Sequence, residues 1–273
     1  MRTLVFGIVM SATLLAAAPA RADAVDDAFA LGNAAASRGE WGAAASAYER
    51  AVALLGQPSS LLSFNLGTAY AHTDDLGRAT LHLRQALDFR GNPTTEIAEA
   101  ARTNLASVRR RAELAAATTG ALIDRPQTWW DLVVETLETP GVGWFALMCG
   151  IAAVVLRVAL RLRRAGPSRA IAVASWLLVA TWAVVGALHA TALRADRTAP
   201  RAVAIGASTD AREGPGLHRT STWSLAAGAE VRITDRTPDR TSGWVHVRLA
   251  GGIEGWVPEA SVAEIERPIG HTR

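Results

Sequence analysis

Cysteine and lysine are the residues of which this chain has the fewest. Cys149 is the one cysteine among 273 residues, so an internal disulfide is impossible, and so is a zinc site with two or more thiolates. Lysine is absent, and its place is taken throughout by arginine. The isoelectric point of about 9.9 would suit nucleic acid, but the arginines form no single basic face. We therefore attribute the arginine bias to codon usage and expect no nucleic-acid partner.

The sequence also lacks the short motifs of common catalytic and nucleotide-binding sites. HExxH, Walker A, GxSxG and GxGxxG do not occur. The six histidines are His72, His82, His189, His218, His246 and His271. Their spacing does not suit a metal, and we expect His72 and His82 on a helix surface. Cys149 lies in an apolar stretch, where a thiol is a poor nucleophile. We expect no enzyme activity, no metal and no cofactor.

The chain is rich in apolar residues, with 50% hydrophobic residues and a mean hydropathy of +0.16. Residues 1–22 have the charged start, apolar run and small-x-small site of a secretory signal peptide. The alternative is an uncleaved membrane anchor. Residues 142–160 and 170–193 are each long enough to cross a hydrocarbon core of about 30 Å. These two stretches predict a hairpin of transmembrane helices.

Arginine gathers between and beside the two apolar stretches, in and around the loop 161–169. The arginines are Arg157, Arg161, Arg163, Arg164 and Arg169. Short arginine-rich loops stay in the cytoplasm, so we predict that the regions on both sides of the hairpin face outward from a bacterial inner membrane. A cleaved signal peptide predicts the same topology. Contact with anionic lipid headgroups explains the arginines further.

Residues 24–117 show a repeated pattern of small and large apolar residues. The segment Leu31–Ala35 recurs as Leu66–Tyr70, 35 positions later. Such a period predicts stacked helix pairs, and Thr94–Ala117 is expected to form a capping helix. The segment Phe64–Tyr70 closely resembles the first helix of the tetratricopeptide repeat, from which the first unit departs at Ala35. A generic helical bundle is the alternative.

The tetratricopeptide resemblance implies a concave surface that binds peptides or protein segments. The matching positions are Phe29, Asn33, Asn65, Thr68 and His72. Asn33 and Asn65 coincide with asparagines that hold a peptide backbone in chaperone-tail-binding repeats. Those clamps also need lysines, so we expect no carboxylate clamp here. The alternative is that these five residues only pack or are solvated.

Residues 200–266 alternate between short apolar strands and glycine turns, which predicts a compact all-β barrel of five strands. The segments Gly243–Leu249 and Gly255–Pro258 closely resemble bacterial SH3 domains, although the loop Thr234–Ser242 is longer and richer in arginine. The resemblance implies binding of peptides, including those of the cell wall. The candidate ligand-binding residues are Trp223, Trp244 and Trp256. The alternative is that these tryptophans fill the barrel.

The whole chain reads as a multidomain membrane protein. The predicted parts are a signal peptide (1–22), helical repeats (24–117), a juxtamembrane linker (118–141), helices at 142–160 and 170–193 around the loop 161–169, an SH3-like barrel (200–266) and a tail (267–273). This order resembles BatE-type proteins of bacterial Bat aerotolerance operons. Members of that family accompany membrane-anchored von Willebrand A-domain proteins and a MoxR-type ATPase, which implies a non-enzymatic scaffold. Peptidoglycan sensing through the barrel and signalling across the membrane are the alternatives.

Overall fold

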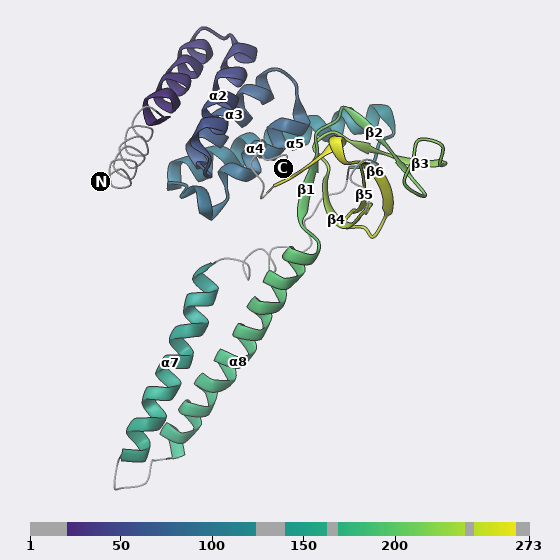
Figure 1. The fold of residues 1–273 in the computed structure, drawn as a ribbon. Coiled ribbons are helices and arrows are strands. Elements are labelled where there is room, and N and C mark those ends of the chain that lie inside the picture. Colours follow the sequence, from purple (N-terminus) through teal and green to yellow (C-terminus); the bar gives the residue numbers. More distant parts are fainter. Residues whose placement is uncertain (1–20, 124–139, 163–168, 238–242, 266–273) are drawn as a thin grey trace, which may run out of the picture. The chain divides into compact units, whose positions relative to one another are not determined.

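The computed structural model describes residues 21–123, 140–162, 169–237 and 243–265. The chain divides into two compact units (Figure 1), Met1–Arg125 with Pro200–Arg273, and Pro126–Ala199. We call the first the helix–sheet unit and the second the hairpin. Nearly all of the predicted signal peptide, most of the predicted linker and arginine loop, and the tail lie outside the described residues.

The N-terminal part of the helix–sheet unit is helical. A helix over residues 21–37 is followed by α2 (Trp41–Leu55), α3 (Ser60–His72), α4 (Leu76–Ala86), the 3-10 turn η1 (Phe89–Gly91) and α5 (Thr95–Thr119). Ser59, Asp75 and Thr94 each precede a helix and accept a hydrogen bond from the main-chain N–H three residues later. Thr94 thus caps α5, and the predicted helical character of residues 24–117 is confirmed.

The repeated glycines mark two equivalent close contacts between helices. A Cβ atom on Gly32 would overlap the Tyr48 ring, and one on Gly67 would lie 2.8 Å from the Leu83 side chain. In both cases the glycine belongs to the first helix of a pair and the large side chain to the second. Because close-packed interiors leave no room for added atoms, these glycines set the distance between the paired helices.

The C-terminal part of the same unit is a seven-stranded antiparallel sheet of order β3-β2-β6-β5-β4-β1-β7. Its strands are β1 (Arg201–Ala204), β2 (Ser208–Arg212), β3 (Ser221–Ala226), β4 (Glu230–Arg236), β5 (Trp244–Arg248), β6 (Glu254–Pro258) and, after the 3-10 turn η2 (Glu259–Ser261), β7 (Val262–Glu264). Leu225, Val245 and Val257 are buried in its core. The expected five strands are thus two too few, because segments such as β2 carry small and polar residues that resemble a loop.

The helices and the sheet are joined through a buried acid, Glu230, at the start of β4. Its side chain is 9% exposed and forms ion pairs with Arg84 of α4, at 2.6 Å, and with Arg109 of α5. Burial acts to raise the pKa of Glu230, but the two guanidinium groups outweigh it and hold the pKa below its ordinary value. The carboxylate therefore stays charged and holds two helices to one strand.

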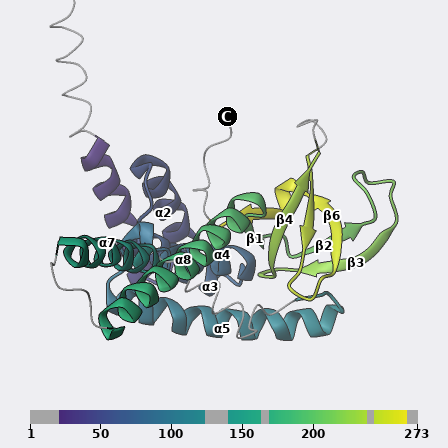
Figure 2. The same cartoon turned by 90° about the horizontal axis from the view of Figure 1, so that it is seen from below.

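The main chain makes a second connection between the two parts. Just beyond α5, the N–H of Leu122 donates to the carbonyl of Ser224 at 2.7 Å, and the Leu122 carbonyl accepts from Ala226 at 3.0 Å. Leu122 is thereby a parallel partner of the edge strand β3. The long helix α5, seen below α3 and α4 in Figure 2, thus leads directly into the sheet. The two regions that the sequence separates as domains pack as one unit.

The hairpin consists of α7 (Pro140–Leu162) and α8 (Arg169–Thr198). Gly141–Ala159 and Ile171–Ala192 are long and apolar enough to cross a membrane, by length and composition. These spans fall within the stretches 142–160 and 170–193 to within one residue. The helix α8 continues for several residues beyond the predicted end at 193.

Two glycines of α7, seven residues apart, lie against large side chains of α8. A Cβ on Gly143 would lie 2.8 Å from the imidazole of His189, and one on Gly150 would lie 2.8 Å from the indole of Trp182. One further step along α7, the guanidinium carbon of Arg157 lies 4.0 Å from the centre of the Trp176 ring. A seven-residue repeat is typical of helices that coil around each other with a left-handed twist.

Candidate functional site

The two asparagines expected on the repeat surface meet in the structure. The Oδ1 atom of Asn33 accepts hydrogen bonds from the Tyr48 hydroxyl at 2.8 Å and from the Asn65 Nδ2 at 3.4 Å. Burial raises the pKa of Tyr48, so its hydroxyl keeps the proton that it donates. The two hydrogen bonds fix which side of the Asn33 amide carries the oxygen, so its NH2 group points to the opposite side.

Thr68 of α3 extends this polar strip to a third helix. Its hydroxyl oxygen accepts from the Nδ2 of Asn104, on α5, at 3.0 Å. Asn104 was not among the predicted residues, although it interrupts an apolar stripe between Ala101 and Leu105 and could have been noticed for that reason. We call Asn33, Asn65, Thr68 and Asn104 the repeat face.

The other two predicted residues lie in aromatic contacts. His72 is exposed at the end of α3, where its ring stacks on Trp41 with the ring centres 3.8 Å apart and the planes 6° from parallel. Phe29 is half-buried and lies 6.0 Å from the Tyr48 ring. Phe29 therefore packs against the Tyr48 ring. The His72–Trp41 stack presents a flat aromatic surface to solvent.

The repeat face carries amides and a hydroxyl but no charged side chain. Such groups both donate and accept hydrogen bonds, as peptide groups do. This chemistry suits an extended main chain more than a carboxylate, for which the chain has no lysine. Arg111, in the second half of α5, donates to the Ala71 carbonyl at 2.8 Å and pairs with Asp74.

The three predicted tryptophans of the sheet are in different environments. Trp244 is only 8% exposed and contributes to the interior. Trp223 lies over Gly255 and donates from its indole N–H to the Glu254 carbonyl at 3.2 Å. Trp256 is half-buried on β6. Trp223 is opposite the buried Ala211 and packs against the core, so of the three tryptophans Trp256 is the one on the outer side of the sheet.

Trp256 stands between two basic residues across the strands. It is in register with Arg212 on β2 and with His246 on β5, whose ring centre lies 5.2 Å from that of Trp256. The Nδ1 atom of His246 is 2.7 Å from the hydroxyl of Thr234. We call Trp256, His246 and Arg212 the sheet face, an aromatic surface with polar edges of the kind that binds extended peptides.

His82 corrects the expectation that it would lie on the surface. It is 3% exposed on α4, stacked against Tyr70 at 5.6 Å between ring centres. Its Nδ1 lies 2.9 Å from the Oε1 of Gln85, and among the described residues no group hydrogen-bonds its Nε2. Burial lowers the pKa of His82 to about 4. The ring is therefore neutral and donates from Nδ1 to Gln85.

Of the five arginines predicted to set the membrane topology, the structure describes the side chain of Arg157 alone. It lies over Trp176, which is a cation–π contact. Arg161 and Arg169 lie in α7 and α8, whereas Arg163 and Arg164 lie outside the described residues. Among the described residues, no group of three histidine, cysteine, aspartate or glutamate side chains is placed to hold a metal ion. Neither a family model nor a curated protein matches the chain.

Proposed function

We propose that this chain is a non-enzymatic, membrane-anchored scaffold that binds proteins of the bacterial envelope. Tetratricopeptide-like helices would contribute the repeat face and an SH3-like barrel the sheet face. Two surfaces with peptide-binding chemistry on one packed unit support this proposal. The Glu230 ion pairs support it further, because they fix the two surfaces to each other as a scaffold requires.

One observation carries the membrane topology. The chain enters the hairpin after α5 and leaves it into β1, and α5 and β1 belong to the same packed unit. A folded unit with polar loops cannot lie across a bilayer, so the hairpin has to return to the side from which it started. Two spans satisfy this condition. Because the loop 161–169 is rich in arginine, we place it in the cytoplasm and the helix–sheet unit in the periplasm.

Cysteine labelling tests this topology in a Cys149→Ser background. Ser107→Cys on α5 and Ser221→Cys on β3 are exposed positions on the two parts of the helix–sheet unit. We expect a membrane-impermeant maleimide to label both in intact spheroplasts. Ser168→Cys, in the loop, should react only after the membrane is opened. Labelling of Ser107→Cys without Ser221→Cys would contradict the proposal.

The resemblance to BatE-type proteins suggests the partners. We propose membrane-anchored von Willebrand A-domain proteins that work with a MoxR-type ATPase. The test is to tag the C-terminus, extract native membranes in mild detergent and identify the proteins that co-purify. Such partners should be lost with the double variant Asn65→Ala and Asn104→Ala and kept with Ser107→Ala. Retention by the double variant would remove the repeat face from the proposal.

A second candidate function is peptidoglycan binding through the sheet face. The observation that favours it is the position of Trp256 between Arg212 and His246 on the outer side of the sheet. Purified cell wall should then retain the full chain, and Trp256→Ala should release it. If wall fragments come down unaffected by the loss of the repeat face while von Willebrand A-domain proteins do not, this second function replaces the first.

A further inference from the structure

Three arginines lie side by side on neighbouring strands of the sheet. Arg201 of β1 is in register with Arg232 of β4, which in turn is in register with Arg248 of β5. Val231 and Ile233, on either side of Arg232, are buried, so the arginines lie on the outer side of the sheet. Because adjacent strands are about 4.8 Å apart, the three side chains start within about 10 Å of one another. We call them the arginine row, and none of them belongs to the repeat face or the sheet face.

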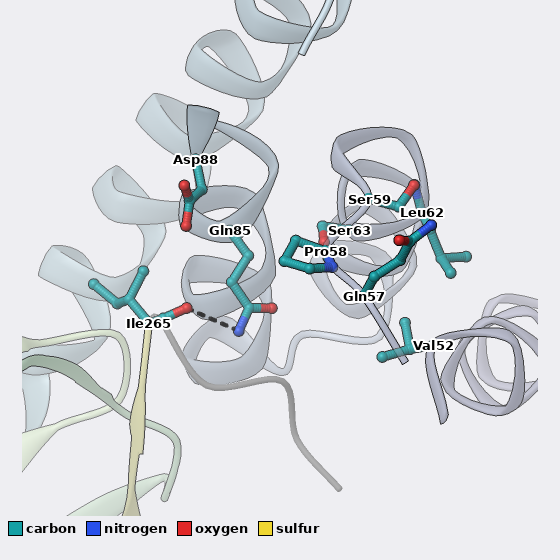
Figure 3. A pocket seen from close by; sticks show the side chains of 9 residues that line it. All are labelled: Val52, Gln57, Pro58, Ser59, Leu62, Ser63, Gln85, Asp88 and Ile265. Carbon is teal, nitrogen blue, oxygen red and sulfur yellow. Dashed lines mark hydrogen bonds between the residues drawn. The ribbon is translucent and has the colours of Figure 1, made fainter. Parts of the chain in front are cut away.

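The main chain at the start of the arginine row is held on both sides. The N–H of Ile233 donates to the carbonyl of Pro200, directly before β1, at 2.9 Å. On the other side of β1, the N–H of Ile265 donates to the Arg201 carbonyl at 3.0 Å. The Nε2 of Gln85 on α4 in turn donates to the Ile265 carbonyl at 3.1 Å (Figure 3). The backbone is therefore in place before any ligand arrives, and binding has to order side chains alone.

Positive charge outweighs negative charge around the arginine row. Glu254 of β6 continues the row in register and pairs with Arg248. Glu230, on the same side of β4 and two residues before the arginine of that strand, is paired with one arginine of α4 and one of α5. These described groups are five arginines, the three of the row and the two at Glu230, against two glutamates. The surface therefore attracts anions.

The chain brings the arginine row close to the end of an apolar span. That span ends at Ala192, and α8 continues to Thr198, about 9 Å further at about 1.5 Å per residue. Arg201 follows three residues later, and three extended residues cover at most about 11 Å. In the proposed membrane, whose headgroup layer is about 5–8 Å thick, the row thus begins at most about 15 Å beyond the headgroups. Arg194, just past the span, is also exposed.

We propose that the arginine row binds the phosphate groups of anionic lipids in the outer leaflet of the membrane, an inference that rests on the membrane anchor of the proposed function. Guanidinium groups bind phosphate oxygens through paired hydrogen bonds. Basic groups close to an anionic bilayer are also attracted by its negative surface potential. The row thereby holds the helix–sheet unit at the membrane surface, and the unit is no longer tied to the membrane by its covalent links alone.

Nanodiscs that contain the full chain test the proposal. Cys149→Ser with Ala250→Cys places one fluorescent label in the exposed turn after β5, two residues beyond Arg248. The nanodiscs consist of phosphatidylcholine with a nitroxide quencher on part of its headgroups, with or without phosphatidylglycerol. We expect phosphatidylglycerol to increase the quenching of the label. Added salt should reverse the increase, because it screens exposed charges.

Three substitutions assign the effect to the arginine row. Arg232→Gln should lower the ratio of lipid-bound to unbound label about fivefold, since one basic side chain at an anionic surface contributes about that much. Arg110→Gln, an exposed change on α5, removes the same charge outside the row and should leave quenching unchanged. Glu254→Gln removes the acid of the row and should raise the ratio. This gain tests the row independently if Arg232→Gln unfolds.

Quenching that does not depend on phosphatidylglycerol would overturn the proposal, and so would equal losses in Arg232→Gln and Arg110→Gln. A fluorescein-labelled oligoglutamate could bind the chain in neutral nanodiscs while phosphatidylglycerol leaves quenching unchanged. That result would assign the row to an acidic protein segment and overturn the assignment to lipid. If the membrane anchor is wrong, no variant enters the nanodiscs and both proposals fail. A chain that enters them but does not respond to phosphatidylglycerol removes this proposal alone.

Discussion

The junction between helices and sheet and the seam of the hairpin are both contacts between elements of the structure, but they differ in chemistry. The junction uses charge, in the Glu230 pairs, and main-chain hydrogen bonds at Leu122. The seam uses shape, with glycines of α7 opposite a tryptophan and a histidine of α8. In the membrane location that we propose for the hairpin, lipid is as apolar as a protein interior, so close packing and not burial of apolar surface has to hold the two helices together. In water, burial brings the parts together and polar pairs fix their orientation.

Removing the charge of Glu230 should have the largest effect on the junction. Glu230→Gln leaves Arg84 and Arg109 without their buried partner, and such losses cost about 3–5 kcal/mol. We expect the free energy of unfolding of the full chain, measured by urea titration in micelles, to fall by that amount. The exposed pair of Arg248 and Glu254 provides the control, since Glu254→Gln should cost no more than about 1 kcal/mol. Equal effects of the two substitutions would show that burial does not distinguish the pairs.

Acid should lower the free energy of unfolding of the helix–sheet unit in two steps. The pKa of His82 is about 4 in the folded chain against an ordinary 6.5, so only the unfolded chain takes up this proton between these values. Stability present above pH 6.5 is therefore lost on the way down to pH 4, by about 3 kcal/mol. Glu230, with a lowered pKa, adds a further loss below pH 4.5.

The variant His82→Phe separates the two steps. It keeps an aromatic ring against Tyr70 but cannot titrate, so it should be less stable at pH 7 and lose the slope between pH 6.5 and 4. Urea titrations at pH 7, 5.5 and 4.5 measure that slope. An unchanged slope in His82→Phe would mean that another group takes up the proton.

Overfilling the seam tests packing in the hairpin. Gly150→Leu places side-chain atoms where the Trp182 indole lies, and overpacking costs about 1–3 kcal/mol. The matched control is Gly186→Leu on α8, because a Cβ there meets no atom within 4 Å. Titration of the full chain with SDS in mixed micelles, followed by tryptophan fluorescence, should show earlier separation for Gly150→Leu alone. If Gly186→Leu is as damaging, the seam does not lie where the glycines place it.

The hydrogen bonds of the repeat face should contribute less to stability than the junction of helices and sheet or the seam of the hairpin. Asn104→Ala removes the donor to Thr68, and a hydrogen bond of this kind contributes about 0.5–1.5 kcal/mol. Ser107→Ala, on the exposed side of the same helix, should stay within about 0.5 kcal/mol of the unmodified chain. Urea titration measures both. A cost as large as that of Glu230→Gln would place Asn104 in the core instead of on a binding surface.

Local patterns in the sequence predict the helices and strands but not which of them pack against each other. The glycines of the repeated unit, the Thr94 cap and the apolar spans are local signals, and each appears in the structure. Glu230 and Arg84 are 146 residues apart, and an acid at the start of an alternating strand resembles a solvated residue. The same holds for His82, a polar residue whose burial depends on what packs over α4. The hydrogen bond from Gln85 to Ile265 could not be predicted either, because the sequence does not show how the helices pack against the sheet.

The cation–π contact of the hairpin should be the smallest effect. Arg157 lies over Trp176, and tryptophan attracts a cation more strongly than phenylalanine does. Trp176→Phe keeps an apolar ring of similar shape, so we expect a loss of about 0.5–1 kcal/mol in the same SDS titration. In an Arg157→Leu background, where the charge is gone, Trp176→Phe should cost nothing further. If the two losses simply add, the ring contributes through packing alone, and the seam of the hairpin is then built from shape along its whole length.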